Sequence, residues 1–223
     1  MTEPPVAPGY QFDHVHRLGS GFVDGTRRAL FLNIPKNASS SLAHLLLSAG
    51  FRYTTAFRTR PVPPGYTVFA VTRDPVSRWI SAMSEYAITV AHRPPEDLTV
   101  EHLRRLRDGT FVPLDQHLTP QSTFLLPTMP VTRWLCFERL ADDYRTLAAD
   151  VGLPDGLRRD NRSDPTLSRR LRELLSDHDH TLIRRFYAED VRLHVLVTRA
   201  RGGPVAGCNL RAPHPAGRAR PEP

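Results

Sequence analysis

The sequence predicts an α/β fold in which a central parallel sheet is flanked by helices within a single three-layer domain. Its 223 residues suffice for one domain, and 40% hydrophobic with 24% charged residues is ordinary for a chain that folds around a core. Short apolar runs, which read as buried strands, are each followed by a segment with helical periodicity. Strands that alternate with helices favour a parallel sheet with helices on its faces.

The first strand and helix lie between residues 29 and 50. Residues 29–34 are almost wholly apolar and end at Pro35, which predicts a buried strand. Residues 39–49 have the spacing of a helix and end before Gly50, a common helix stop. The apolar positions of that helix are Leu42, Leu45, Leu46 and Ala49.

The later elements repeat this pattern. Residues 67–72 are β-branched and aromatic and predict a second strand. Asp74 is a typical N-cap and Pro75 a typical first helical residue, so a helix should run from here to about residue 91. A third strand at 131–136, a helix at about 138–151 and two helical stretches at about 167–177 and 179–198 complete the domain.

The two ends of the chain differ from its body. Residues 1–9 and 201–223 are rich in proline and poor in large apolar side chains, so we expect disordered ends around a domain at 10–200. The chain has neither a leader-like start nor an apolar stretch of about 20 residues, and its two cysteines do not indicate a disulfide framework. These features predict a cytoplasmic protein that does not enter a membrane.

The formal net charge of +7 does not by itself indicate a nucleic-acid partner. Four arginines and one glutamate of the 201–223 tail account for +3 of it, and acidic residues are interspersed elsewhere. Lys36 is the one lysine among 30 basic residues, a bias typical of GC-rich genomes. A lysine retained in such a chain suggests a place that needs a compact point charge rather than the planar fork of arginine.

Lys36 lies in a polar loop between the first strand and the first helix. The loop reads Pro35-Lys36-Asn37-Ala38-Ser39-Ser40-Ser41. Its small side chains let an anion approach the main-chain N–H groups at the helix N-terminus, and the serines add hydroxyl donors, so the loop suits a phosphate. It lacks the framing glycines of the nucleoside-triphosphatase loop, and a plain serine-rich helix cap with a surface lysine is the alternative.

A second motif follows the 67–72 strand. Arg73 stands at the carboxyl end of that strand, where ligands of open α/β sheets bind, and Ser81 lies about two turns into the next helix. Arg78 lies between them on the same helix. Taken singly, each residue also has a purely structural explanation as part of a helix start or a surface ion pair.

Together the two motifs resemble those of sulfotransferases that use 3′-phosphoadenosine 5′-phosphosulfate (PAPS), closest to the carbohydrate (Golgi-type) branch. Residues 35–41 look like the 5′-phosphosulfate loop, and Arg73-Asp74-Pro75-x-x-Arg78-x-x-Ser81 looks like the 3′-phosphate motif. Residues 115–121 and 137–143 are similar to further segments of that branch. The resemblance covers about residues 28–195 and implies a P-loop nucleotide-binding-like fold.

The resemblance implies in-line transfer of a sulfuryl group from PAPS to a hydroxyl of a sugar or small natural product, with adenosine 3′,5′-bisphosphate (PAP) as the product. Lys36 would stabilise charge on the leaving phosphate. The residues expected to bind the cofactor are Pro35, Lys36, Asn37, Ala38, Ser39, Ser40 and Ser41 on the 5′ side, and Arg73 and Ser81 on the 3′-phosphate.

The general base for the acceptor is less defined by the sequence. Many relatives place a histidine or glutamate between the first helix and the 3′-phosphate motif, but residues 51–72 contain no His, Asp or Glu. His117 is the first candidate, because a neutral imidazole near pH 7 suits the role, and a packing histidine is the alternative. Weaker candidates are His44, Glu85, His92 and Asp115.

Three other functions stay open at this stage. They are an inactive PAP- or PAPS-binding relative, a small nucleotide-dependent kinase and a basic nucleic-acid binder, of which the last is disfavoured. No metal is expected, since the spacing shows no ligand cluster and His178 with His180 reads as a surface feature. The expected partner is a glycan or small molecule, and the sequence does not indicate an oligomeric state.

Overall fold

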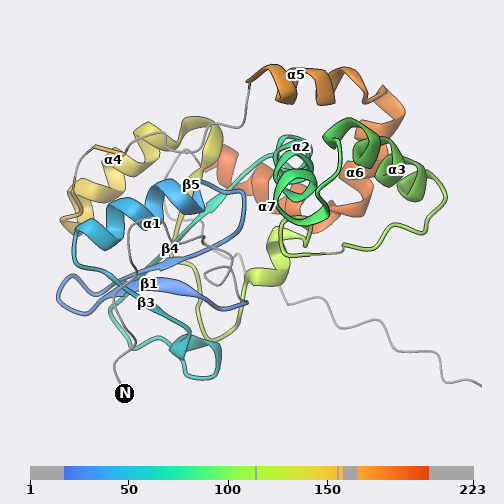
Figure 1. The fold of residues 1–223 in the computed structure, drawn as a ribbon. Helices are drawn as coiled ribbons and strands as arrows, with labels where there is room; N and C mark the ends of the chain where they lie inside the picture. The colour runs from blue at the N-terminus through green and yellow to red at the C-terminus, as the bar shows by residue number, and fades with distance from the viewer. Residues whose placement is uncertain (1–17, 114, 155, 158–164, 201–223) are drawn as a thin grey trace, which may run out of the picture.

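A computed structural model describes residues 18–113, 115–154, 156–157 and 165–200, which form an α/β fold with a five-stranded mixed sheet flanked by helices (Figure 1). The ends predicted to be disordered, at 1–9 and 201–223, lie outside the described residues. Among the described residues, no helix combines the length and the apolar character needed to cross a membrane.

The strand order is β3-β1-β2-β4-β5. The three predicted strands are present as β2 (Ala29–Leu32), β4 (Thr67–Thr72) and β5 (Arg133–Cys136), and β4 runs parallel to both of its neighbours. Two strands that the sequence analysis did not identify, β1 (Gly21–Asp24) and β3 (Arg52–Thr54), extend the sheet beyond β2.

The predicted parallel sheet is present only in part: β2, β4 and β5 are parallel, and the complete sheet is mixed. β1 pairs antiparallel with both β2 and β3. A short turn joins β1 to β2, and in it Asp24 accepts from the main-chain N–H groups of Thr26 and Arg27. A turn of this length permits only the antiparallel hairpin, whereas a parallel pair needs a long crossover. β3 has only three residues, and β1, with the sequence GFVD, lacks the continuous apolar run by which β2 was predicted.

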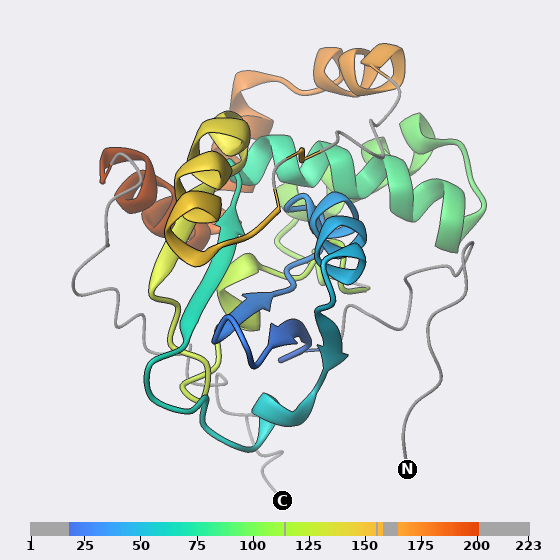
Figure 2. The same ribbon diagram turned by 90° about the vertical axis from the view of Figure 1, so that its left-hand side faces the viewer.

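The sheet separates two apolar cores. On one face, α1 (Ser39–Ser48) and α4 (Leu140–Val151) cover the alternate strand residues that include Phe31 and Phe69. On the other face, α7 (Ala188–Arg199) and the short helix η4 (Gln121–Phe124) cover Leu30 and Ala70. Figures 1 and 2 show these layers, which follow from the two-residue period of the strands.

A third core forms between helices beside the sheet. α2 (Pro75–Tyr86), α3 (Pro95–Arg107), α5 (Pro165–Glu173) and α6 (Asp177–Phe186) surround it. Asp74 caps α2 as predicted, by accepting from the main-chain N–H of Ser77 at 2.9 Å. After Tyr86 the chain continues as a π-helical turn, η3 (Ala87–Ala91).

Two helical predictions need revision. α3 falls within a region to which the sequence analysis assigned no element, and the predicted helix at 179–198 is two helices, α6 and α7, that meet at Tyr187. Tyr187 leaves the helical conformation there, and its hydroxyl donates to the main-chain oxygen of Leu118 at 2.6 Å. This tertiary contact anchors the junction of α6 and α7 to the segment that carries His117.

Candidate active site

The loops that follow β2 and β4 meet at one edge of the sheet. β2 and β4 are parallel neighbours, so their carboxyl ends lie side by side. Arg73 donates from Nη1 to the main-chain oxygen of Lys36 at 3.0 Å, and Arg78 donates from Nε to that of Pro35 at 3.1 Å. The structure thus brings the two sequence motifs into direct contact.

The loop 35–41 has an unusual backbone. Lys36 and Ala38 both have positive φ angles, of 66° and 59°, which side chains with a Cβ seldom adopt. Each such residue costs about 1–2 kcal/mol, so the surrounding contacts must hold the loop in this shape. Ala38 occupies the N-cap position of α1 without a capping side chain, which leaves that helix end suited to an external anion.

Asn37 anchors this loop to the end of β4. Its side chain is buried and donates from Nδ2 to the main-chain oxygen of Val71 at 2.7 Å and to Oε1 of Gln121 at 2.6 Å. Asn37 is expected to bind the 5′ side of the cofactor, but its main-chain N–H donates to the Ile34 oxygen at 3.3 Å and its side chain supports the loop.

Gln121 joins both motifs, and sequence reasoning gave it no role. Its Oε1 accepts from the main-chain N–H of Arg73 at 3.0 Å as well as from Asn37, and its Nε2 donates to the Arg73 oxygen at 2.9 Å. The Gln121 main-chain N–H donates in turn to the Asp190 carboxylate of α7 at 2.7 Å. The sequence signals for Gln121 were the polar stretch beside His117 and the resemblance of residues 115–121 to a segment of the carbohydrate sulfotransferases.

Arg78 is a second buried support of the site. Its side chain is 2% exposed, and besides Pro35 it binds the main-chain oxygen of Thr119 at 2.8 Å. Burial lowers the pKa of its guanidinium, and the nearby Asp190 carboxylate counteracts that effect. Arg78 therefore connects the first loop to the segment that carries His117.

One face of α2 lines the site. Ser77, Ser81 and Glu85 recur every four residues and so share that face. Arg73 donates from Nε to the Ser77 hydroxyl at 3.3 Å at one end of this row, and the Lys36 ammonium forms an ion pair with Glu85 at the other. Ser81, predicted to hold the 3′-phosphate, is buried between these two positions.

Arg73 is held in a half-buried position. Its guanidinium lies over the ring of Phe137, 4.1 Å from the centroid. Burial lowers its pKa to about 10, with Glu138 acting in the opposite direction, so Arg73 stays charged at neutral pH. Asp74 beside it donates its main-chain N–H to Oε1 of Glu138 at 3.0 Å.

Four charged side chains form a row that begins at Lys36. Its ammonium pairs with Glu85, and Oε1 of Glu85 lies 3.7 Å from Nε2 of His117. Nδ1 of His117 lies 2.6 Å from Oδ2 of Asp115, whose Oδ1 accepts from the His117 main-chain N–H at 2.9 Å. Glu85 is the most exposed of the four, at 41% of its side chain.

The contacts within this row shift the pKa of Lys36, of Glu85 and of His117. Burial lowers the pKa of Lys36, and the Glu85 carboxylate partly offsets this. His117 and then Lys36 hold the pKa of Glu85 at about 2 against the effect of burial. Burial also disfavours the charged form of His117, but Asp115 and Glu85 outweigh it and raise its pKa to about 9.

The expectation of a neutral imidazole at pH 7 therefore does not hold in this arrangement, because His117 carries a proton between two carboxylates. Of the weaker base candidates, Glu85 and Asp115 belong to the row. His44 and His92 lie on exposed positions of α1 and at the end of η3. The site thus offers Glu85 as an ionised, accessible carboxylate.

A comparison of the chain with protein-family models, curated proteins and solved structures finds no match. The site itself defines a class: an α/β protein with cations, hydroxyls and an open helix N-terminus at the carboxyl edge of two parallel strands. Such a set of groups suits a ligand with more than one anionic centre.

Proposed function

We propose that this chain is a PAPS-dependent sulfotransferase that transfers a sulfuryl group to a hydroxyl of a sugar or small natural product. The observation that carries the proposal is the junction of its two motifs, in which Arg73 binds the main-chain oxygen of Lys36. Two motifs that resemble the 5′-phosphosulfate loop and the 3′-phosphate motif are thereby parts of one site. We also propose that the fold is related to those of P-loop nucleotide-binding proteins.

The residues present fit a nucleotide with two separate anionic groups. Lys36, the main-chain N–H groups at the start of α1 and the serines at 39–41 would hold the 5′ side. Arg73 and Ser81 would hold the 3′-phosphate, since Arg73 stays charged and presents a planar fork of donors. When bound, PAPS supplies the sulfuryl group, whose bond to the 5′-phosphate breaks as the bond to the acceptor oxygen forms.

Lys36 and Glu85 have separate roles in the reaction: Lys36 acts on the leaving group and Glu85 on the acceptor. The Lys36 ammonium would leave Glu85 and stabilise the charge that grows on the leaving phosphate oxygen. Because Glu85 then loses a neighbouring cation, its pKa rises and it becomes a better proton acceptor. We assign the acceptor proton to Glu85, with His117 and Asp115 holding its carboxylate in place.

Ligand-dependent thermal unfolding tests the cofactor. PAP should raise the Tm more than adenosine 5′-phosphate or ATP with magnesium, since a ligand that binds only the folded state stabilises it. A larger shift with ATP and magnesium would overturn the proposal in favour of a kinase.

A transfer assay tests the chemistry. Labelled PAPS should transfer its sulfuryl group to at least one member of a panel of glycans, glycosylated metabolites and phenols. Glu85→Gln should abolish this transfer and keep PAP binding, and Glu85→Asp should restore part of it. PAP binding without transfer to any acceptor would identify an inactive binding protein instead.

A further inference from the structure

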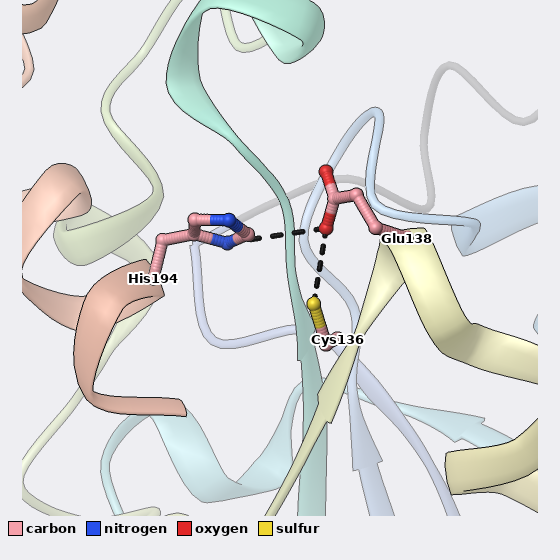
Figure 3. A group of neighbouring side chains, drawn as sticks. All are labelled: Cys136, Glu138 and His194. Carbon is pink, nitrogen blue, oxygen red and sulfur yellow. Dashed lines mark hydrogen bonds and ion pairs between the residues drawn. The ribbon is translucent and has the colours of Figure 1, made fainter. Parts of the chain in front are cut away.

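A group of three potential metal ligands lies at the carboxyl end of β5. Cys136 is the last residue of that strand, Glu138 follows in the short helix η5 (Phe137–Arg139), and His194 faces them from α7 (Figure 3). One carboxylate oxygen, Oε2 of Glu138, lies 3.1 Å from Sγ of Cys136 and 4.0 Å from Nδ1 of His194. The three ligand atoms all lie within 4.8 Å of one another.

These separations are close to those of a tetrahedral zinc site. Zinc bonds of about 2.3 Å to sulfur and about 2.0–2.2 Å to nitrogen and oxygen place neighbouring ligand atoms roughly 3.5 Å apart. The contact between Cys136 and Glu138 is slightly shorter than this, and that between Glu138 and His194 slightly longer. The Cys136 and His194 ligand atoms lie within 4.8 Å of each other, so rotation of the His194 ring would have to bring Nδ1 closer to both of the other ligands.

The hydrogen bonding around the group leaves one ligand atom, Nδ1 of His194, for a further ligand, while the Cys136 thiol contacts both Glu138 and the Thr198 hydroxyl. Nδ1 of His194 is buried without a hydrogen-bond partner among the described residues. Glu138 uses its other oxygen, Oε1, to accept from the main chain of Asp74, so its Oε2 faces the group. The Cys136 thiol donates a hydrogen bond to Glu138, and this bond does not involve His194.

We propose that Cys136, Glu138 and His194 bind a zinc ion, with a water as the fourth ligand. Thiolate, imidazole and carboxylate together suit zinc among the common divalent metals, whereas calcium and magnesium prefer oxygen alone. On binding, the Cys136 thiol releases its proton to solvent and His194 ligates through the lone pair of Nδ1. The ion ties the end of β5 to α7, and this zinc site does not rest on the proposed sulfotransferase activity, although Glu138 also contacts the main chain of Asp74.

Metal titration of the full chain tests the site. Protein stripped of metal and reduced should bind Co²⁺ at one equivalent with the near-ultraviolet absorption of a thiolate–cobalt bond, and Zn²⁺ should displace it. Cys136→Ser should remove that absorption, while Cys208→Ser, a change at the other cysteine of the chain, should keep it. Absence of the thiolate band, or its loss in Cys208→Ser alone, would overturn the proposal.

Two matched histidine variants provide a second test that does not depend on the buried cysteine. His194→Gln should weaken Zn²⁺ binding at least tenfold and remove the rise in Tm that Zn²⁺ gives the unaltered chain. His178→Gln, at an exposed position of α6, should change neither. Equal Zn²⁺ affinity in the two variants would contradict a role for His194.

Discussion

The guanidinium of Arg73 binds the main-chain oxygen of Lys36 at 3.0 Å, so the cation of one motif holds the backbone of the other. The bonded oxygen belongs to a residue with a positive φ, a conformation that must be stabilised from outside. Arg73 therefore acts on the shape of the loop as well as on any anion bound there.

Lys36 should be the most sensitive position for transfer. Lys36→Ala removes the charge proposed to stabilise the leaving group and should lower kcat by about 10²–10³-fold, with a smaller change in KM. Lys36→Arg should remain strongly impaired, because the wide guanidinium does not replace a compact ammonium. Steady-state kinetics with PAPS measure both values. Arg192→Ala, an exposed cation on α7, serves as the control, and unaltered kcat in Lys36→Ala would refute the assigned role.

Arg73 should determine the preference for a 3′-phosphate. Arg73→Ala should weaken PAP binding roughly 10- to 150-fold, since a hydrogen bond to a charged group contributes about 1.5–3 kcal/mol. Binding of adenosine 5′-phosphate should change much less. Calorimetric titration with both nucleotides gives the ratio of the two affinities. Ser81→Ala should shift this ratio in the same direction by a smaller factor, and an unchanged ratio in both variants would exclude a 3′-phosphate site here.

Gln121 should affect both stability and nucleotide binding. Gln121→Met leaves the Asn37 amide and both main-chain groups of Arg73 without this partner, and should lower the free energy of unfolding by about 1–3 kcal/mol. PAP affinity should fall as well, because the two loops lose their common anchor. Urea unfolding and calorimetry provide the measurements. Gln116→Ala, in the same segment, is the matched control; a Gln121 variant with lowered stability but full PAP affinity would limit Gln121 to the core.

The charge of His117 should make stability depend on pH. Its pKa in the fold, about 9, exceeds its ordinary value of 6.5, so the protonated form stabilises the fold fully below pH 6.5 and this contribution disappears as the pH rises through 9. The shift corresponds to at most about 3 kcal/mol. The Tm of the unaltered chain should thus fall between pH 6.5 and 9.5 more steeply than that of His117→Gln. His92→Gln, at an exposed position, should retain the steep fall, and parallel curves for all three proteins would contradict the pairing.

The sequence alone determined those elements that depend on residues close together in the chain. The β4 strand, the Asp74 cap and the start of α2 were predicted at their observed positions, because β-branched runs, N-cap chemistry and helix-initiating proline act within a few residues. The same holds for the placement of both motifs between strand and helix. These signals survive in the sequence because they need no distant partner.

The tertiary structure decided what depends on distant contacts. The pairing of β3 with β1, the contact of Tyr187 with Leu118 and the role of Gln121 all arise between segments far apart in the chain. The protonation of His117 combines both origins, because Asp115 is a neighbour two residues away whereas Glu85 approaches from α2. A residue type fixes which charges a side chain can carry, and only its folded neighbours fix which one it carries at neutral pH.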